Sequence, residues 1–159
     1  MYDLIVFCPE KKRLWKRWPA TDIYIEKEKR YWDIWKYLTV QKGKWYSLLT
    51  VPDEIGGSKL CETIDLDRTI DLPDVPKEDR ECLTPYRIRR QFLGDFKKIL
   101  NYLLDCSALK TVYVLARYQS DDKEVVLGTY SVDTFLSLME AGRVYSNICY
   151  IISNQPNAL

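Results

Sequence analysis

TVYVLARYQSDDKEVVLGTYSVDTFLSLMEAGRVYSNICYIIS, residues 111–153, holds the clearest alternation of strand and helix signals in the chain. Residues 111–119 and 124–130 are rich in β-branched and aromatic side chains, which favour strands. The polar residues 120–123 between them are typical of a turn. These residues therefore predict a β-hairpin.

A helix and a final strand are predicted after this hairpin. Ser131 is a favourable N-cap, Asp133 follows in the first turn, and Gly142 stands where a helix often ends. We expect a helix over residues 131–141, whose inward side chains are Phe135, Leu136 and Met139. The apolar run 147–153 predicts the last strand.

The longest helical periodicity lies upstream, over residues 84–105. Thr84 followed by Pro85 is typical of a helix start, because Thr can cap the first amide groups and Pro suits the first helical position. Apolar spacings of four and three then repeat along one face, at Ile88, Phe92, Phe96, Ile99 and Leu103. The opposite face is expected to be solvated and to carry Arg87, Arg89, Arg90, Lys97 and Lys98.

The N-terminal half predicts further strands at residues 2–8, 22–26 and 44–51. Residues 28–40 leave helix and strand open, although the spacing of Tyr31, Ile34, Trp35 and Leu38 favours a short helix. The sum predicts an α+β fold, with a largely antiparallel sheet and at least two helices. A length of 159 residues suits a single globular domain over 1–159.

Histidine is absent from the chain. Most general-base, catalytic-triad and zinc chemistry uses this side chain, because its charge changes near neutral pH. The chain also lacks a glycine-rich phosphate loop, since Gly56-Gly57 is typical of a turn. We therefore predict that the protein is not an enzyme and has no catalytic residues and no cofactor.

Cysteine usage and the N-terminus indicate the compartment. The five cysteines are odd in number, widely spaced and without a CxxC pair, so we expect reduced thiols that bind no metal: Cys8, Cys61, Cys82, Cys106 and Cys149. The apolar run near the N-terminus is too short for a signal peptide or a membrane span. These patterns predict a cytoplasmic protein without membrane association.

Charge is unevenly distributed, although the net charge is only +1. Residues 1–50 carry 11 Lys and Arg against 6 Asp and Glu, whereas residues 51–82 carry 4 against 10. The apolar pattern is also weakest over 51–82, which predicts an acidic loop or edge excursion. We expect this segment to bind a partner through Asp65, Asp67, Asp71, Asp74, Glu78, Asp79 and Glu81.

A metal site at these carboxylates is disfavoured. Asp65 and Asp67 would share one face of an extended segment, with Ile64 and Leu66 on the other, as on a solvated strand. The calcium-loop pattern also lacks its glycine and its final glutamate. We therefore expect these carboxylates to act by charge and not by coordination.

Aromatic and basic residues are interleaved in the N-terminal part of the chain. All five tryptophans lie there: Trp15, Trp18, Trp32, Trp35 and Trp45. Such a pattern can stack bases and hold phosphates. It is more often an aromatic half-core with a basic rim, and no RNA- or DNA-binding motif accompanies it. Nucleic acid is therefore the less favoured partner.

The C-terminal third resembles a known class of proteins. Residues 111–118, 126–131 and 149–152 are similar to the closing hairpin, helix and strand of small bacterial immunity proteins, which neutralise contact-dependent or polymorphic toxins. The resemblance covers about 50 residues and has no diagnostic motif. It implies tight, inhibitory binding of a cognate protein toxin, which is often a nuclease, and it transfers no functional residue.

Three functions stay open from the sequence. The favoured one is a non-catalytic immunity protein that uses the acidic segment 51–82 against a basic toxin surface. The first alternative is a nucleic-acid-associated module that uses the basic aromatic N-terminal half. The second is an enzyme that works with carboxylates alone, which would need a cleft holding acids of raised pKa.

Overall fold

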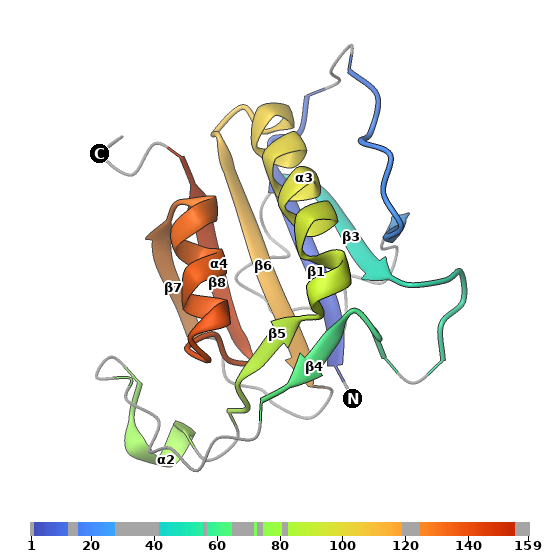
Figure 1. The fold of residues 1–159 in the computed structure, drawn as a ribbon. Helices are drawn as coiled ribbons and strands as arrows, with labels where there is room; N and C mark the ends of the chain where they lie inside the picture. Colours follow the sequence, from blue (N-terminus) through green and yellow to red (C-terminus); the bar gives the residue numbers. More distant parts are fainter. Residues whose placement is uncertain are drawn as a thin grey trace.

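A computed structural model describes residues 2–12, 16–27, 42–55, 57–64, 72, 75–80, 83–118 and 125–154. A six-stranded sheet forms the centre, and two helices lie side by side on one of its faces (Figure 1). These helices are α3 (Arg90–Cys106) and α4 (Val132–Glu140). None of the helices within the described ranges is long and apolar enough to cross a membrane.

The strands of the sheet follow the order β2-β3-β1-β6-β8-β7. Every neighbouring pair is antiparallel except β7 and β8, so the predicted α+β fold with a largely antiparallel sheet is confirmed. The bounds, in sheet order, are β2 (Tyr24–Lys27), β3 (Gly43–Leu49), β1 (Tyr2–Pro9), β6 (Thr111–Tyr118), β8 (Ile148–Ser153) and β7 (Val125–Tyr130). The four strands predicted at 2–8, 22–26, 44–51 and 147–153 correspond to β1, β2, β3 and β8.

Strand β1 lies near the middle of the sheet because both of its faces are buried. Leu4 and Val6 pack into the main core, which also contains the buried side of α3. Ile5 and Phe7 point to the other face, where they pack with Trp45 in a second apolar cluster. A short run of consecutive apolar residues is the pattern expected of such a strand.

The predicted hairpin of 111–119 with 124–130 is wrong in its pairing. The structure has both strands, as β6 and β7, but β8 lies between them and pairs with each. Strand β7, helix α4 and strand β8 form a crossover in which β7 and β8 are parallel. Strand β8 is buried almost throughout, whereas β7 is half-exposed, so burial places β8 inside and β7 at the edge.

The long helix begins later than the predicted 84–105. Helix α3 begins at Arg90, and its N-cap residue Arg89 makes no side-chain capping bond. The residues before it form β5 (Tyr86–Ile88), which pairs with β4 (Cys61–Thr63) in a separate two-stranded sheet.

Long-range contacts explain this change from helix to strand. Tyr86 and Ile88 are buried while Arg87 is half-exposed, which is a strand alternation. The amide of Thr84 donates to Ser146 Oγ at 3.1 Å, and the amide of Tyr86 donates to the carbonyl of Val144 at 3.0 Å. Thr84 is therefore tied to the loop before β8 and does not cap a helix.

Helix α4 follows the prediction closely. Ser131 is its N-cap, and the Thr134 amide donates to Ser131 Oγ at 3.1 Å. Phe135 and Met139 are fully buried, and Gly142 has a φ of 72°, a left-handed conformation suited to a glycine after a helix. Local capping signals were sufficient to predict this helix.

The remaining described helix is α2 (Lys77–Arg80), a single short turn. In Figure 1 this helix and the β4–β5 pair lie at the opposite end of the molecule from the C-terminal end of α3. The helix-or-strand alternatives for residues 28–40 lie outside the described residues.

Candidate interaction surface

The predicted acidic site is described only in part. Glu78 is exposed on α2, and Asp79 is the next residue of that helix. The other members lie outside the described residues: Asp65, Asp67, Asp71, Asp74 and Glu81. The acidic segment therefore stays a prediction.

One carboxylate of the acidic segment is already paired within the fold. Glu62 on β4 accepts a hydrogen bond from Arg87 Nε at 2.7 Å, and Arg89 lies 3.5 Å from its other oxygen. The bond from Arg87 lowers the pKa of Glu62. Arg87 and Arg89 were expected on the polar side of the long helix; they instead neutralise part of the acidic segment.

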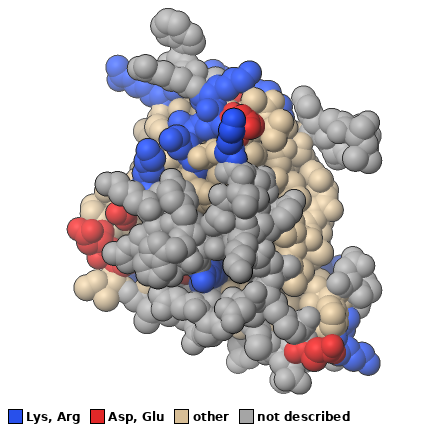
Figure 2. Space-filling model, turned by 180° about the vertical axis from the view of Figure 1, so that it is seen from behind, with Lys and Arg blue, Asp and Glu red and all other residues tan. Residues whose placement is uncertain are grey.

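The most concentrated charge in the described structure is positive and lies at the end of the sheet where β1 and α3 end and β3 and β6 begin. We call it the basic end, and it consists of Lys11, Lys12, Lys16, Arg17, Lys42, Lys44 and Lys110. All are exposed except the half-buried Lys11, and only Glu10 and Asp105 bring carboxylates to the same described end. From behind, Figure 2 shows Lys and Arg gathered at this end of the molecule.

None of the seven cations forms a salt bridge with a described residue. Lys110 Nζ instead donates to the carbonyl of Asp105 at 3.3 Å. This carbonyl belongs to the last turn of α3, where a cation also interacts favourably with the helix dipole. Within the described part of the chain, the charge of the basic end is therefore not neutralised by salt bridges.

Backbone hydrogen bonds hold the basic end together. The Lys12 amide donates to the Cys106 carbonyl at 2.7 Å, and the Glu10 amide donates to the Lys42 carbonyl at 2.9 Å. Ser107 Oγ donates to the carbonyl of Pro9 at 2.7 Å and is itself buried. Three distant segments of the chain thus form one fixed surface before any partner arrives.

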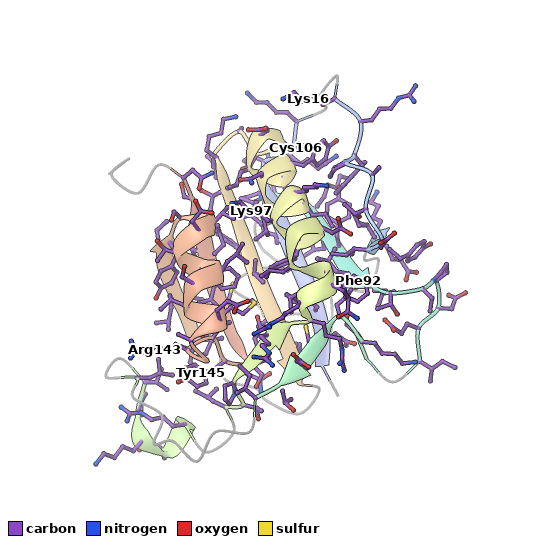
Figure 3. All side chains as sticks on the ribbon, viewed as in Figure 1. Lys16, Phe92, Lys97, Cys106, Arg143 and Tyr145 are labelled. Atoms are coloured by element: carbon purple, nitrogen blue, oxygen red, sulfur yellow. The ribbon has the colours of Figure 1, made fainter. Side chains whose placement is uncertain are left out.

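An aromatic cluster supports the next part of this surface. The ring of Trp18 contacts Tyr46 edge-on, with centroids 5.1 Å apart, and contacts Tyr102 of α3 at 4.6 Å. Tyr102 also donates from its hydroxyl to the Lys16 carbonyl at 3.2 Å, and Figure 3 places Lys16 close to Cys106 at the end of α3. Trp18 agrees with the predicted aromatic half-core, as does Trp45, which is buried against Phe7.

The sequence shows the cation surplus of residues 1–50, but it did not predict that cations from distant segments form one surface at the basic end. Its members come from residues 11–17, from residues 42–44 and from Lys110, and only the sheet order brings these parts of the chain together. A usable signal was present in the sequence, because basic residues closely follow or precede predicted strand and helix ends. The order of the strands was needed to place those ends side by side.

Three of the described cysteines lack the lowered pKa that is typical of a reactive thiol. Burial raises the pKa of Cys61 and of Cys149 to about 12. Burial, with a smaller effect from Cys106, raises the pKa of Cys8 to about 12 as well. These thiols stay protonated at neutral pH, and the thiolate is the reactive form. Within the described ranges no three His, Cys, Asp or Glu side chains group as metal ligands.

Comparison with known proteins returns no relative: no family model, no curated protein and no solved structure matches the chain.

Proposed function

We propose that the protein acts by binding another protein and not by catalysis, and that it neutralises a protein toxin by direct contact. The observation that supports this proposal is the basic end. Seven cations occupy one hydrogen-bonded surface, and none of them has a salt-bridge partner among the described residues.

Such an arrangement costs folding free energy, because like charges held close together repel one another. A role in folding would instead favour pairing of each lysine with a carboxylate, as Lys97 on α3 pairs with Asp133 at 2.8 Å. Unpaired charge on a fixed surface favours binding, because it attracts a complementary partner and speeds the encounter.

The basic end requires an acidic surface on the toxin. The acidic segment 51–82 would instead meet a basic surface, such as the cleft of a nuclease. We place the main docking surface at the basic end, because its backbone is fixed by hydrogen bonds between distant segments. The pairing of Glu62 with Arg87 and Arg89 also reduces the free charge of the acidic segment.

A nucleic-acid function is the second candidate, since the same cations could contact phosphates. A protein that neutralises several phosphates loses affinity steeply as salt rises, whatever the sequence of the nucleic acid. Strong retention of the protein on DNA or heparin, with a steep salt dependence and no binding to a neighbouring gene product, would favour this alternative.

The experiment uses the product of the reading frame next to the gene for this chain as the candidate toxin. Three charge-altered proteins are compared with the wild type. The basic-end variant carries Lys12→Glu, Arg17→Glu and Lys42→Glu. The matched control variant carries the same charge change at exposed positions elsewhere, Lys77→Glu, Lys98→Glu and Arg143→Glu. The acidic-segment variant carries Asp65→Lys, Asp67→Lys, Asp71→Lys and Asp74→Lys.

Growth protection on co-expression and the dissociation constant are measured for each protein. We expect the basic-end variant to lose roughly tenfold or more in affinity and to lose protection, while the control variant retains both. Loss in the acidic-segment variant alone would contradict the choice of docking surface. A neighbouring product that is neither toxic nor bound would overturn the proposed function.

A further inference from the structure

A cleft of about 410 Å³ lies beside the basic end, at the β2 edge of the sheet. Its walls come from the segment that precedes β2, from β2 itself and from one residue of β3. The described residues that line it are Trp18, Pro19, Ala20, Thr21, Ile23, Tyr24, Ile25, Lys27 and Tyr46. Its volume is within the range of ligand-binding pockets.

The walls of the cleft are held in place by α3. Tyr102 of this helix stacks obliquely against Trp18 and bonds through its hydroxyl to the Lys16 carbonyl. Asp95, about two turns earlier on the same side of α3, accepts a hydrogen bond from the Asp22 amide at 3.0 Å. The segment from Lys16 to Asp22 is thus attached to the helix at both ends, so the cleft exists before a ligand binds.

The chemistry of the cleft is aromatic with a basic rim. Tyr24 is 39% exposed and is one of four exposed large hydrophobic side chains within the described ranges. Among the described lining residues, Lys27 carries the only charge. Lys16 and Arg17 of the basic end directly precede Trp18 in the chain. Lys27 pairs with Tyr46 across β2 and β3, and the Tyr46 ring contacts Trp18, so the three cations gather on the Trp18–Tyr46 side of the cleft.

We propose that this cleft is an anchor site for one aromatic side chain of an acidic segment on the partner protein. The inference rests on the proposed function, because the anchor site would give partner binding at the basic end its specificity. Protein interfaces concentrate binding energy where an aromatic side chain fills a desolvated pocket, and surrounding charges add orientation and rate. Carboxylates next to the anchor would meet Lys16, Arg17 and Lys27 on the Trp18–Tyr46 side of the cleft.

The occupant is a protein segment and not a free small molecule. The cations beside Trp18 and Tyr46 match an extended chain with carboxylates next to its aromatic residue. A chain running past the cleft would also continue onto the basic end, which a small molecule could not reach. Binding of an isolated aromatic acid as tightly as a peptide would contradict this assignment.

The test uses three synthetic pentapeptides and backbone amide NMR of the full chain. The probe is acetyl-Glu-Glu-Phe-Glu-Glu-amide, and the two comparison peptides replace Phe with Ala or every Glu with Gln. We expect the probe to shift the resonances of Thr21, Tyr24 and Lys27, and to bind several-fold more tightly than either comparison peptide. Equal binding of the three peptides, or no shift at these residues, would overturn the anchor site.

A cleft-filling variant makes the test specific. Ala20 is exposed and lines the cleft, so Ala20→Trp should occupy it and abolish the shifts caused by the probe. Ala141→Trp introduces the same side chain at an exposed position after α4 and should leave binding unchanged. Unchanged probe binding by the Ala20→Trp variant would overturn the anchor.

The two proposals fail in different ways. If the anchor alone is wrong, the probe does not bind, yet the wild type still protects against the neighbouring toxin and the basic-end variant does not. If the proposed function is wrong, the neighbouring product is neither toxic nor bound, whatever the peptides do.

Discussion

The helix-bearing face of the sheet and the basic end differ in what holds them together. On the helix-bearing face, α3 and α4 bury fully apolar side chains such as Phe96 and Phe135 against the strands. At the basic end, backbone hydrogen bonds join three segments whose charged side chains are mostly exposed and mostly basic. The comparison indicates that burial of apolar side chains stabilises the fold, whereas the charge at the basic end serves a purpose other than stability.

The strongest test of this division removes a side chain from the helix-bearing face. Phe96 is fully buried on α3, so Phe96→Ala should lower the free energy of unfolding by about 3–5 kcal/mol through lost burial and a cavity. Urea denaturation measures the change. A loss below about 1 kcal/mol would mean that this face does not dominate stability as we claim.

A second change acts at the basic end, where β3 begins beside the end of β1. Gly43 begins β3 opposite Pro9, and a Cβ at this position would overlap the carbonyl oxygen of Cys8 and the ring of Phe7. Gly43→Ala should therefore cost about 1–3 kcal/mol, because backbone must move to make room. Chemical denaturation tests it, and an unchanged midpoint would show that the start of β3 is more adaptable than its contacts indicate.

A third change should raise stability without altering the buried side of α3 or the basic end. Gly94 lies on the exposed side of α3, and a Cβ there would meet nothing within 4 Å. Gly94→Ala should stabilise the protein by about 0.5–1 kcal/mol, because alanine has the higher helix propensity. The readout is again the free energy of unfolding in urea. A destabilised variant would contradict the position assigned to this residue.

The smallest effect concerns the ion pairs that neutralise Glu62. Arg87 lowers the pKa of this carboxyl from its ordinary value of 4.5, so the carboxylate stabilises the folded state above that value. This contribution is lost as the pH falls through the lower, folded pKa. Glu62→Gln should lower the melting temperature slightly at pH 7 and leave it unchanged at low pH.

A matched control for this pH dependence is Glu26→Gln, at an exposed position on β2 that forms no salt bridge with a described residue. Thermal unfolding followed by circular dichroism across the acid range compares the two variants. The same pH dependence in both would show that the pairing with Arg87 contributes nothing particular.

Local signals predicted the helices and strands of this fold better than they predicted which elements contact one another. Ser131 and Gly142 marked the ends of α4, because capping depends on residues close in sequence. The start of α3 was misplaced, because the burial of Tyr86 and its bond to Val144 outweigh the favourable helix start at Thr84 and Pro85. Sequence periodicity contains no information about contacts over such distances.

The absence of long-range information in the sequence also explains why the position of β8 and the basic end were not predicted. The turn between the two strands predicted a hairpin, yet β8 is more deeply buried than β7 and takes the place between β6 and β7. The basic end depends on that kind of long-range order, since Lys110 follows α3 in the chain but lies beside the end of β1. Charge counts along the sequence could indicate a basic half of the chain but not a surface.

The central claim is that the basic end is kept for binding at a cost to folding. Its most direct test is the urea unfolding free energy of the wild type, the basic-end variant and the control variant, at about 0.01 M and about 1 M salt. At low salt we expect the basic-end variant to be more stable than the wild type by a few tenths of a kcal/mol, because repulsion is relieved. This gain should disappear at high salt and be absent from the control variant. A basic-end variant that is less stable than the control at low salt would contradict the account.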